Sequence, residues 1–398
     1  MDDELRHIFL CDAELASALA DELRAVQGDA DIAGGADRRA LILEDRHLRR
    51  TEEAITLAFA RQTLPNARLL PAASINEIAR TASQSIIEAC EDVASWRLDI
   101  LRAEGEAAPG ANRVRLVRSE IEAQLKKRRR RLLKTLAAEA APADVPPLGA
   151  AITAPEILVQ LYLETRERNW LSLYGPFRNF DDSFWRRCVS PWPGGMWEAA
   201  ENRAPPSRAY RKLAEALTQF PSLKRPGPIS GDPATTGRAS RESGQLTIQR
   251  GELCVDLGAS PGGWSWLALK RGAHVVAVDR SPLREDLMRH PGLEFVQGDA
   301  FQYRPERTVD WLICDVIAFP GRTLELLADW IGGRRCRKFC VTVKFRGAED
   351  YGVLAELKNM LNKAAGDFAI RRLGENKNEV TVFGFVQARN SANRFGLE

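Results

Sequence analysis

The chain has 398 residues, of which 44% are hydrophobic and 28% are charged, and its formal net charge is only +3. This length predicts two or three domains with hydrophobic cores, and the small net charge means that any nucleic-acid surface must come from local clustering. No apolar run is long enough to cross a bilayer, and the acidic start MDDELRHIFL is not typical of a secretory signal. Seven scattered cysteines, four histidines and no CxxC pattern favour a cytoplasmic protein with reduced cysteines and no metal site.

The amino-terminal half of the chain divides into two predicted domains. In residues 1–70, short apolar runs (HIFLC, ALILE) alternate with amphipathic stretches (AELASALADELRAV, TEEAITLAFARQ), which predicts a small α+β domain. Residues 71–204 begin with the helical pattern INEIARTASQSIIEACEDVASWRL and later contain the strand-like segment ILVQLYLE and an aromatic-rich stretch. We expect a second mixed domain there.

Six consecutive cations, KKRRRR, stand within a helical pattern of the second domain. Because these charges repel one another, an anionic partner would stabilise the segment, and a phosphate backbone is the natural candidate. A solvated basic surface is the plainer alternative. The candidate RNA-binding residues of this run are Lys126, Lys127, Arg128, Arg129, Arg130 and Arg131.

From residue 205 onward the pattern changes to regular alternation. A helical segment, PPSRAYRKLAEALTQF, precedes residues 221–245, which lack apolar periodicity and predict an exposed loop. Strand-like runs then alternate with helical segments, which predicts βαβ units, a mostly parallel sheet and an α/β fold. The runs are ELCVDL, HVVAVD, LEFVQ, VDWLICDV and KFCVTVKF, and the chain closes with FAIRRL and EVTVFGFVQ. The last two have no helix between them, so we expect an antiparallel hairpin at the sheet edge.

A glycine-rich turn follows the first strand of this region, in the segment LCVDLGASPGGWSW. Ligands of a doubly wound sheet lie beyond the carboxyl ends of its strands, where Asp256 and Asp279 end two successive runs. Asp279 suits an acid that accepts hydrogen bonds from a ribose. The turn differs from the G-x-G-x-x-G pattern that cradles a pyrophosphate, and an acid before it repels phosphate but attracts an ammonium. A ligand with a ribose and an ammonium but no phosphate is S-adenosyl-L-methionine (SAM).

Further residues complete this predicted cofactor site. Asp299 follows the third strand, and we expect it to accept from the adenine amino group; solvated acids at strand ends are the plainer interpretation. The residues themselves predict cofactor binding by Asp256, Gly258, Gly262, Gly263, Asp279 and Asp299.

The segment DLGASPGGWSW resembles the SAM-binding loop of the FtsJ-type (RrmJ-like) ribose 2'-O-methyltransferases, and residues 205–398 follow that family. The resemblance implies a Rossmann-like methyltransferase fold with a seven-stranded sheet and a catalytic Lys-Asp-Lys-Glu tetrad. It also adds Ala259, Ser260, Pro261, Trp264 and Asp315 to the predicted cofactor-binding residues. The motifs SRAYRKL, LICDV, VTVKF and NEVTVFG place the four members of the tetrad at Lys212, Asp315, Lys344 and Glu379.

The family's chemistry explains why a lysine is needed. A ribose hydroxyl is a very weak acid, so a base must take its proton, and a lysine serves only when burial or a nearby cation lowers its pKa. The resemblance assigns this role to Lys344, with Asp315 orienting the lysine amine and Glu379 steadying Lys212 or the hydroxyl. Arg208 and Arg211 flank Lys212, and we expect them to meet RNA phosphates beside the target ribose.

The order of domains also resembles that of family members which methylate a cytidine of large-subunit (23S) rRNA. It implies a ferredoxin-like domain over residues 1–70, a THUMP-like RNA-binding domain over 71–204 and the methyltransferase domain over 205–398. The implied partner is RNA, either 23S rRNA or a large-subunit assembly intermediate, and we expect a cytoplasmic monomer without a membrane partner. Three alternatives stay open: the same chemistry on tRNA or another rRNA, a non-catalytic RNA-binding or ribosome-assembly protein, and a nicotinamide-dependent oxidoreductase, which the missing G-x-G-x-x-G disfavours.

Overall fold

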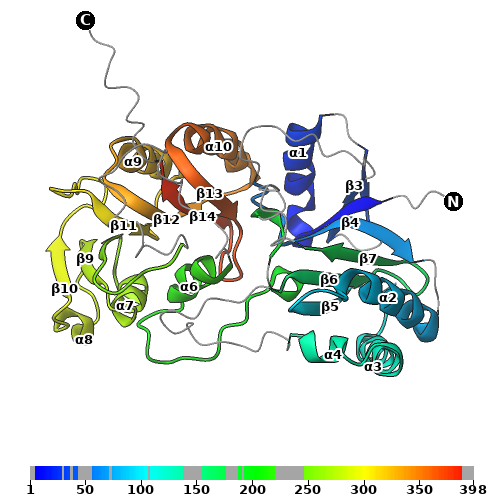
Figure 1. Ribbon diagram of the computed structural model, residues 1–398. Coiled ribbons are helices and arrows are strands. Elements are labelled where there is room, and N and C mark those ends of the chain that lie inside the picture. Colours follow the sequence, from blue (N-terminus) through cyan, green and yellow to red (C-terminus); the bar gives the residue numbers. More distant parts are fainter. Residues whose placement is uncertain are drawn as a thin grey trace, which may run out of the picture. The chain divides into compact units, whose positions relative to one another are not determined.

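The computed structural model describes residues 5–28, 31–35, 39–43, 56–70, 74–105, 108–137, 155–175, 187–190, 192–219 and 246–387 (Figure 1). These residues form two compact units that divide after residue 198, and each unit contains one seven-stranded sheet. Within these ranges no helix combines the length and the apolar character needed to span a bilayer. All seven cysteines are buried. The loop predicted over residues 221–245 lies outside the described residues.

The first unit contains a mixed sheet with the strand order β2-β3-β1-β4-β7-β6-β5. Its strands are β1 (Arg6–Leu10), β2 (Ile32–Gly34), β3 (Ala40–Leu43), β4 (Gln62–Leu70), β5 (Trp96–Arg102), β6 (Ile157–Leu163) and β7 (Asn169–Tyr174). Strand β4 pairs with both β1 and β7, so strands from the two predicted amino-terminal domains share one sheet. The ferredoxin-like and THUMP-like assignments, with their boundary at residue 70, stay predictions. The helical pattern over TEEAITLAFARQ was wrong in its described part, because residues 56–61 form no helix and β4 begins at Gln62.

Four helices accompany this sheet in the described part of the first unit: α1 (Ala16–Gln27), α2 (Ile75–Cys90), α3 (Ala111–Arg128) and α4 (Leu132–Thr135). Helix α2 begins with a capping box, in which the Ser74 hydroxyl accepts from the Glu77 amide and the Glu77 carboxylate accepts from the Ser74 amide. Residues alternate across β6, so Val159 and Leu161 join the core under α2 and α3, whereas Tyr162 joins a core on the other face. This alternation fixes α2 and α3 against one face of the sheet.

The second unit is an α/β fold with the strand order β10-β9-β8-β11-β12-β14-β13. Its strands are β8 (Leu253–Leu257), β9 (His274–Asp279), β10 (Leu293–Gln297), β11 (Val309–Cys314), β12 (Cys336–Lys344), β13 (Ala365–Arg371) and β14 (Glu379–Val386). All are parallel except β14, which runs antiparallel to β12 and β13. The α/β fold and the antiparallel hairpin are confirmed. Of the two hairpin strands, however, only β13 lies at an edge of the sheet, because β14 lies between β13 and β12.

Helices cover both faces of this second sheet. They are α6 (Tyr210–Gln219), α7 (Gly263–Lys270), α8 (Glu285–Met288), α9 (Pro320–Gly332) and α10 (Val353–Ala364). Figure 1 shows α6 and α7 on one face and α9 and α10 on the other. The strand order reverses direction between β8 and β11, so the carboxyl ends of these strands are where such folds bind ligands.

Candidate active site

The structure brings the four residues of the predicted tetrad together near the carboxyl ends of β11 and β12 in the second sheet. Lys344 ends β12 and Glu379 begins the antiparallel β14, and the strand register places the two directly opposite each other. Asp315 immediately follows β11, which is parallel to β12, and Lys212 comes from α6. Three elements of one sheet and one covering helix thus converge on one cluster.

Lys212 lies between the two carboxylates of this cluster. Its Nζ is 3.1 Å from each carboxylate oxygen of Asp315 and 2.6 Å from Oε1 of Glu379. Burial alone lowers the pKa of Lys212, but the nearby carboxylates outweigh it and raise the pKa overall. Lys212 is therefore held as a cation.

Lys344 has a different environment. Its Nζ donates to the Asp315 carbonyl at 3.0 Å, lies 3.1 Å from Asp315 Oδ1 and is 3.9 Å from Glu379 Oε2. Its side chain is 22% exposed, against 10% for Lys212. Of the two amines, Lys344 is thus the one more accessible to a substrate.

Asn376 is a buried residue that sequence reasoning missed. Its Nδ2 donates to Glu379 Oε1 at 3.1 Å, while its Oδ1 accepts from the Leu373 amide and the Thr381 hydroxyl. These contacts fix the side chain of Asn376 and through it the Glu379 carboxylate that faces Lys212. In the sequence, Asn376 could have been identified by its position three residues before the predicted tetrad residue Glu379.

The glycines of the predicted cofactor turn are needed by contacts inside the chain. Gly258 and Gly262 have φ angles of 74° and 109°, in the region that favours glycine. A Cβ on Gly258 would lie 2.9 Å from the Val316 side chain, and one on Gly262 would lie 2.4 Å from Leu287. A Cβ on Gly263 would lie 2.5 Å from the Ser207 hydroxyl. Close packing of the turn is therefore a second explanation for these glycines, beside the predicted close approach of a ligand.

The other residues of the turn have separate surroundings. Ala259 is buried, whereas Ser260 is half-buried and Pro261 is exposed. The Trp264 indole is buried and donates to the Ala209 carbonyl at 2.8 Å, which ties α7 to the start of α6. Trp264 therefore supports the helix that carries Lys212.

The predicted acids at the strand ends differ in burial. Asp256 is only 1% exposed and accepts from the Ser265 hydroxyl at 2.6 Å. Burial raises the pKa of Asp256 to about 7. Asp279 is half-buried, and its two oxygens accept from the Ser260 and Ser281 amides at 3.0 and 2.9 Å. The backbone of the turn thus orients the Asp279 carboxylate, as a ribose-binding acid requires.

Asp299 lies at the end of the adjoining strand β10, in an ion pair. Its Oδ1 accepts from the Phe301 amide at 2.9 Å, and its Oδ2 accepts from Arg280 at 2.8 Å. The hydrogen bond from the Phe301 amide is the main cause that lowers the pKa of Asp299, and the hydrogen bond from Arg280 lowers it further. Arg280 and Arg322, which lies 3.7 Å from the same oxygen, are both more than half exposed, so a ligand that competes for Asp299 needs to displace only surface side chains.

Two exposed apolar side chains stand next to the tetrad, and sequence reasoning also missed them. Ile317 is 89% exposed and Phe319 is 64% exposed, and both follow closely after Asp315. The Arg346 guanidinium lies over the Phe319 ring, 5.0 Å from its centroid. In the sequence, the apolar segment VIAF stands between Asp315 and Pro320, and this position after a strand could have indicated an exposed apolar surface.

The predicted RNA-binding arginines of the second unit share one partner. Arg208 and Arg211 both donate to Glu375 Oε1 at 2.9 Å. The Arg208 side chain is 75% exposed and that of Arg211 is 18% exposed. Only Arg208 therefore offers much of its surface to an external phosphate.

The basic run of the first unit is exposed along its whole length. The predicted helix ends inside it, at Arg128, and a short helix resumes at Leu132. Cations in the last turn of α3 suit the negative end of its dipole, while Arg129 and Arg131 lie 3.6 and 2.7 Å from Glu91. Part of the run is thus explained by the fold itself.

Comparisons with known proteins match the site to a family. Residues 205–387 match the family model of the FtsJ-like methyltransferases. Proteins named ribosomal RNA large subunit methyltransferase M are similar over about half of the chain. That of Azoarcus sp. (strain BH72) is 32% identical over 202 residues, which cover 50% of each chain. That of Azotobacter vinelandii is 35% identical over 196 residues (48% of this chain, 50% of the relative). That of Laribacter hongkongensis is 33% identical over 231 residues (56% and 58%).

The chain thus spans about half the length of the curated relatives that it matches. The family match covers all four tetrad residues, the glycine turn and every strand of the second sheet. The second unit of this chain is therefore similar to the FtsJ-like methyltransferases over nearly all of its described residues.

Proposed function

We propose that this chain transfers a methyl group from SAM to a ribose 2'-hydroxyl of RNA, and that the target is a cytidine of 23S rRNA. The observation that carries this proposal is the convergence of Lys212, Asp315, Lys344 and Glu379 at the ligand-binding edge of the sheet, where ion pairs of 2.6 to 3.9 Å link them. The substrate is proposed from the relatives, whose printed names specify large-subunit ribosomal RNA.

The residues near the glycine turn fit SAM. Asp279 is oriented by two backbone amides and keeps further lone pairs for ribose hydroxyls. The Ser207 hydroxyl, beside Gly263, is buried and has no hydrogen-bond partner among the residues that the structure describes, so a polar ligand has a group to bind there. Above its raised pKa, Asp256 contributes negative charge close to the turn. When bound, SAM supplies an electrophilic methyl group on a sulfonium.

In this proposal the tetrad works by positioning and proton transfer. Lys344, the more accessible amine, accepts the proton of the ribose hydroxyl once it has lost its own proton, and Asp315 orients it through both a carboxylate oxygen and its carbonyl. Lys212 stays protonated, bridges the carboxylates of Asp315 and Glu379 and offsets their mutual repulsion. Asn376 keeps Glu379 in place.

Ile317 and Phe319 support the choice of a nucleic-acid substrate. Large apolar side chains are usually buried, and an exposed pair beside a catalytic cluster indicates a binding surface. An unpaired base stacks well on an aromatic ring, and sequence-specific RNA recognition usually targets such bases. We infer that Phe319 contacts the base of the target nucleotide. An rRNA substrate places the activity in the cytoplasm, and the monomer stays a prediction.

The test is transfer of labelled methyl from SAM to RNA from cells that lack this gene. Protein-free rRNA and large-subunit precursor particles are assayed in parallel, with Lys344→Ala as the inactive variant and Lys363→Ala, an exposed lysine of α10, as the matched control. We expect label on 23S rRNA at one ribose that resists alkaline hydrolysis, and loss of label only with Lys344→Ala. Label on tRNA or small-subunit rRNA would change the substrate. No label on any RNA, with SAM binding intact, would favour a non-catalytic RNA-binding protein.

A further inference from the structure

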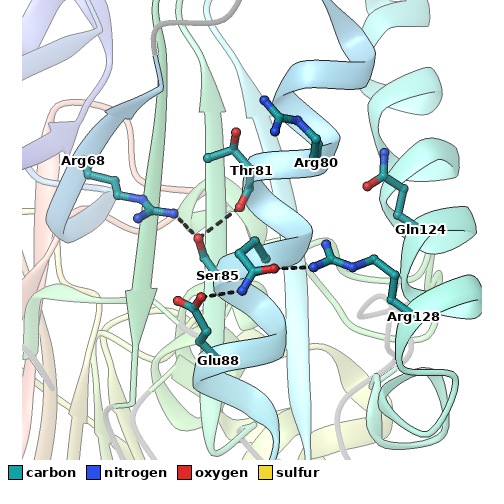
Figure 2. A pocket seen from close by; sticks show the side chains of 8 residues that line it. Arg68, Arg80, Thr81, Ser85, Glu88, Gln124 and Arg128 are labelled. Carbon is teal, nitrogen blue, oxygen red and sulfur yellow. Dashed lines mark hydrogen bonds between the residues drawn. The ribbon is translucent and has the colours of Figure 1, made fainter.

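A pocket of about 540 Å³ lies in the first unit, between β4, α2 and α3. It is lined by Arg68, Arg80, Thr81, Gln84, Ser85, Glu88, Gln124 and Arg128 (Figure 2). Every one of these side chains is polar or charged, and three arginines against one glutamate leave a net charge of +2. A pocket with this lining suits a hydrophilic anion and not an apolar ligand.

The helical spacing explains why these residues meet. On α2 the lining positions recur three, four, seven and eight residues apart, so they lie on one face of the helix. Gln124 and Arg128 are four residues apart on α3 and face α2 from the other side, as Figure 2 shows. Arg68 approaches from β4 and donates to the Ser85 hydroxyl. Arg68 and Ser85 form the inner part, because Ser85 is buried, whereas Arg80 and Arg128 are exposed at the rim.

The three arginines of the pocket lack carboxylate partners in the part of the chain that the structure describes. Arg80 has no hydrogen bond there, and Arg128 donates only to the neutral Gln84 side chain. Arg68 bonds the Ser85 hydroxyl, while its Nε is buried without a partner. The single acid of the pocket, Glu88, accepts a hydrogen bond from the Gln84 amide at 2.5 Å.

Other arginines of the same unit show the usual arrangement. Arg97 pairs with Asp99 at 2.8 Å, Arg131 with Glu91 at 2.7 Å, and Arg61 with Asp12. Guanidinium groups that outnumber the acids near them repel one another, and an oxyanion offsets that repulsion while accepting hydrogen bonds from their N–H groups. The pocket thus has charge and donors that the fold itself does not use.

We propose that this pocket binds a phosphate group of single-stranded RNA and anchors the substrate on the first unit. Arg128 both lines the pocket and belongs to the exposed run Lys126–Arg131, so a strand held in the pocket continues along a cationic surface. No aromatic side chain lines the pocket, so it reads the backbone and not a base. The proposal rests on the proposed function for its choice of RNA as the source of the phosphate.

The test is equilibrium binding of a fluorescein-labelled single-stranded RNA 20-mer to the full chain as a function of salt. Arg80→Gln and Arg128→Gln remove exposed rim cations, so they should fold, and each should weaken binding about 10-fold. The double variant should also lower the slope of log K against log salt by about 0.7 for each RNA phosphate that the pocket no longer neutralises. Glu88→Gln removes the only anion of the pocket and should tighten binding about threefold. Arg115→Gln, an exposed arginine on the same helix outside the pocket, is the matched control and should change nothing.

Other outcomes would overturn the proposal. Unchanged RNA affinity in both rim variants, or an equal loss with Arg115→Gln, would leave no role for the pocket in RNA binding. If inorganic phosphate protects the wild-type chain against thermal unfolding but not the rim variants, while RNA affinity is unchanged, the pocket serves a free oxyanion instead. Absence of RNA binding by the wild-type chain would also refute it. Failure of the proposed function is distinguishable, since it would abolish methyl transfer while the rim variants still weakened RNA binding.

Discussion

Asp256→Asn is the substitution that most directly tests the electrostatics of the second unit. Asp256 lies buried in β8 and accepts from the Ser265 hydroxyl of α7. An asparagine has nearly the same shape, and its amide oxygen can accept the same bond. The substitution therefore removes the charge and leaves the packing of the strand unchanged.

The expected effect on stability follows from the raised pKa of Asp256. Burial raises that pKa from 3.8 to about 7, so between these values the folded chain binds more protons than the unfolded chain. Its free energy of unfolding then falls as pH rises, by about 1.4 kcal/mol per unit. From pH 5 to pH 7 the loss is up to about 3 kcal/mol, and above pH 7 it levels off. Asp256→Asn lacks this loss, so it should be more stable than the wild-type chain at pH 8, and the difference should shrink toward pH 5.

The assay is urea unfolding at pH 5, 6, 7 and 8, followed by hydrogen exchange of peptides that cover β8 and α7. Asp286→Asn is the control, because contact with Arg284 lowers the pKa of Asp286, and its removal should produce no gain at high pH. A stability difference between Asp256→Asn and the wild-type chain that stays constant over this range would refute the reasoning. SAM affinity, measured at pH 8, should fall in Asp256→Asn if this carboxylate attracts the ammonium.

Substitutions at three further positions test the candidate active site. Lys212→Met removes the closer of the two cations shared by the Asp315 and Glu379 carboxylates and leaves only Lys344, so methyl transfer should be lost and the free energy of unfolding should fall by about 3 kcal/mol, measured by urea unfolding. Asn376→Ala should lower kcat about 10-fold without a large change in SAM affinity, because Glu379 loses its fixed donor; an unchanged kcat would remove Asn376 from the site. Phe319→Ala should raise the KM for RNA about 10-fold and Phe319→Tyr should not, since an aromatic ring is what the base requires; equal KM values would show that Phe319 does not contact RNA.

The strands of the second unit could be predicted because each is a distinct apolar run that ends in a charged or turn residue. Every one of the seven runs became a strand, and the positions of Asp279, Asp315, Lys344 and Glu379 at strand ends followed from that. The position of β14 could not be predicted. Its insertion between β12 and β13 depends on cross-strand pairing, such as Lys344 with Glu379, which no local pattern specifies.

The first unit was harder to predict because its patterns conflict. The segment QTLPNARLL contains a proline and polar residues, yet it forms β4, which joins the two halves of the sheet. The exposure of the charged run KKRRRR agrees with both interpretations of it, a phosphate-binding surface and a solvated one, but the pocket beside it was not predicted. Arg68, Arg80 and Arg128 are far apart in the sequence, and only the packing of β4, α2 and α3 brings them together.

The glycine turn links the two predicted sites, which explains why one short motif was so informative. Gly258 allows close approach of Val316, the residue after Asp315, so the turn controls where the acid of the tetrad lies. Gly263 leaves room for Ser207, and Trp264 holds the Ala209 carbonyl, so the same turn places the start of the helix that carries Lys212. A turn shaped for a cofactor therefore also positions two of the four groups that would act on the substrate. Changing the turn should disturb proton transfer as well as cofactor binding, and the two functions cannot be separated by substitutions at these glycines.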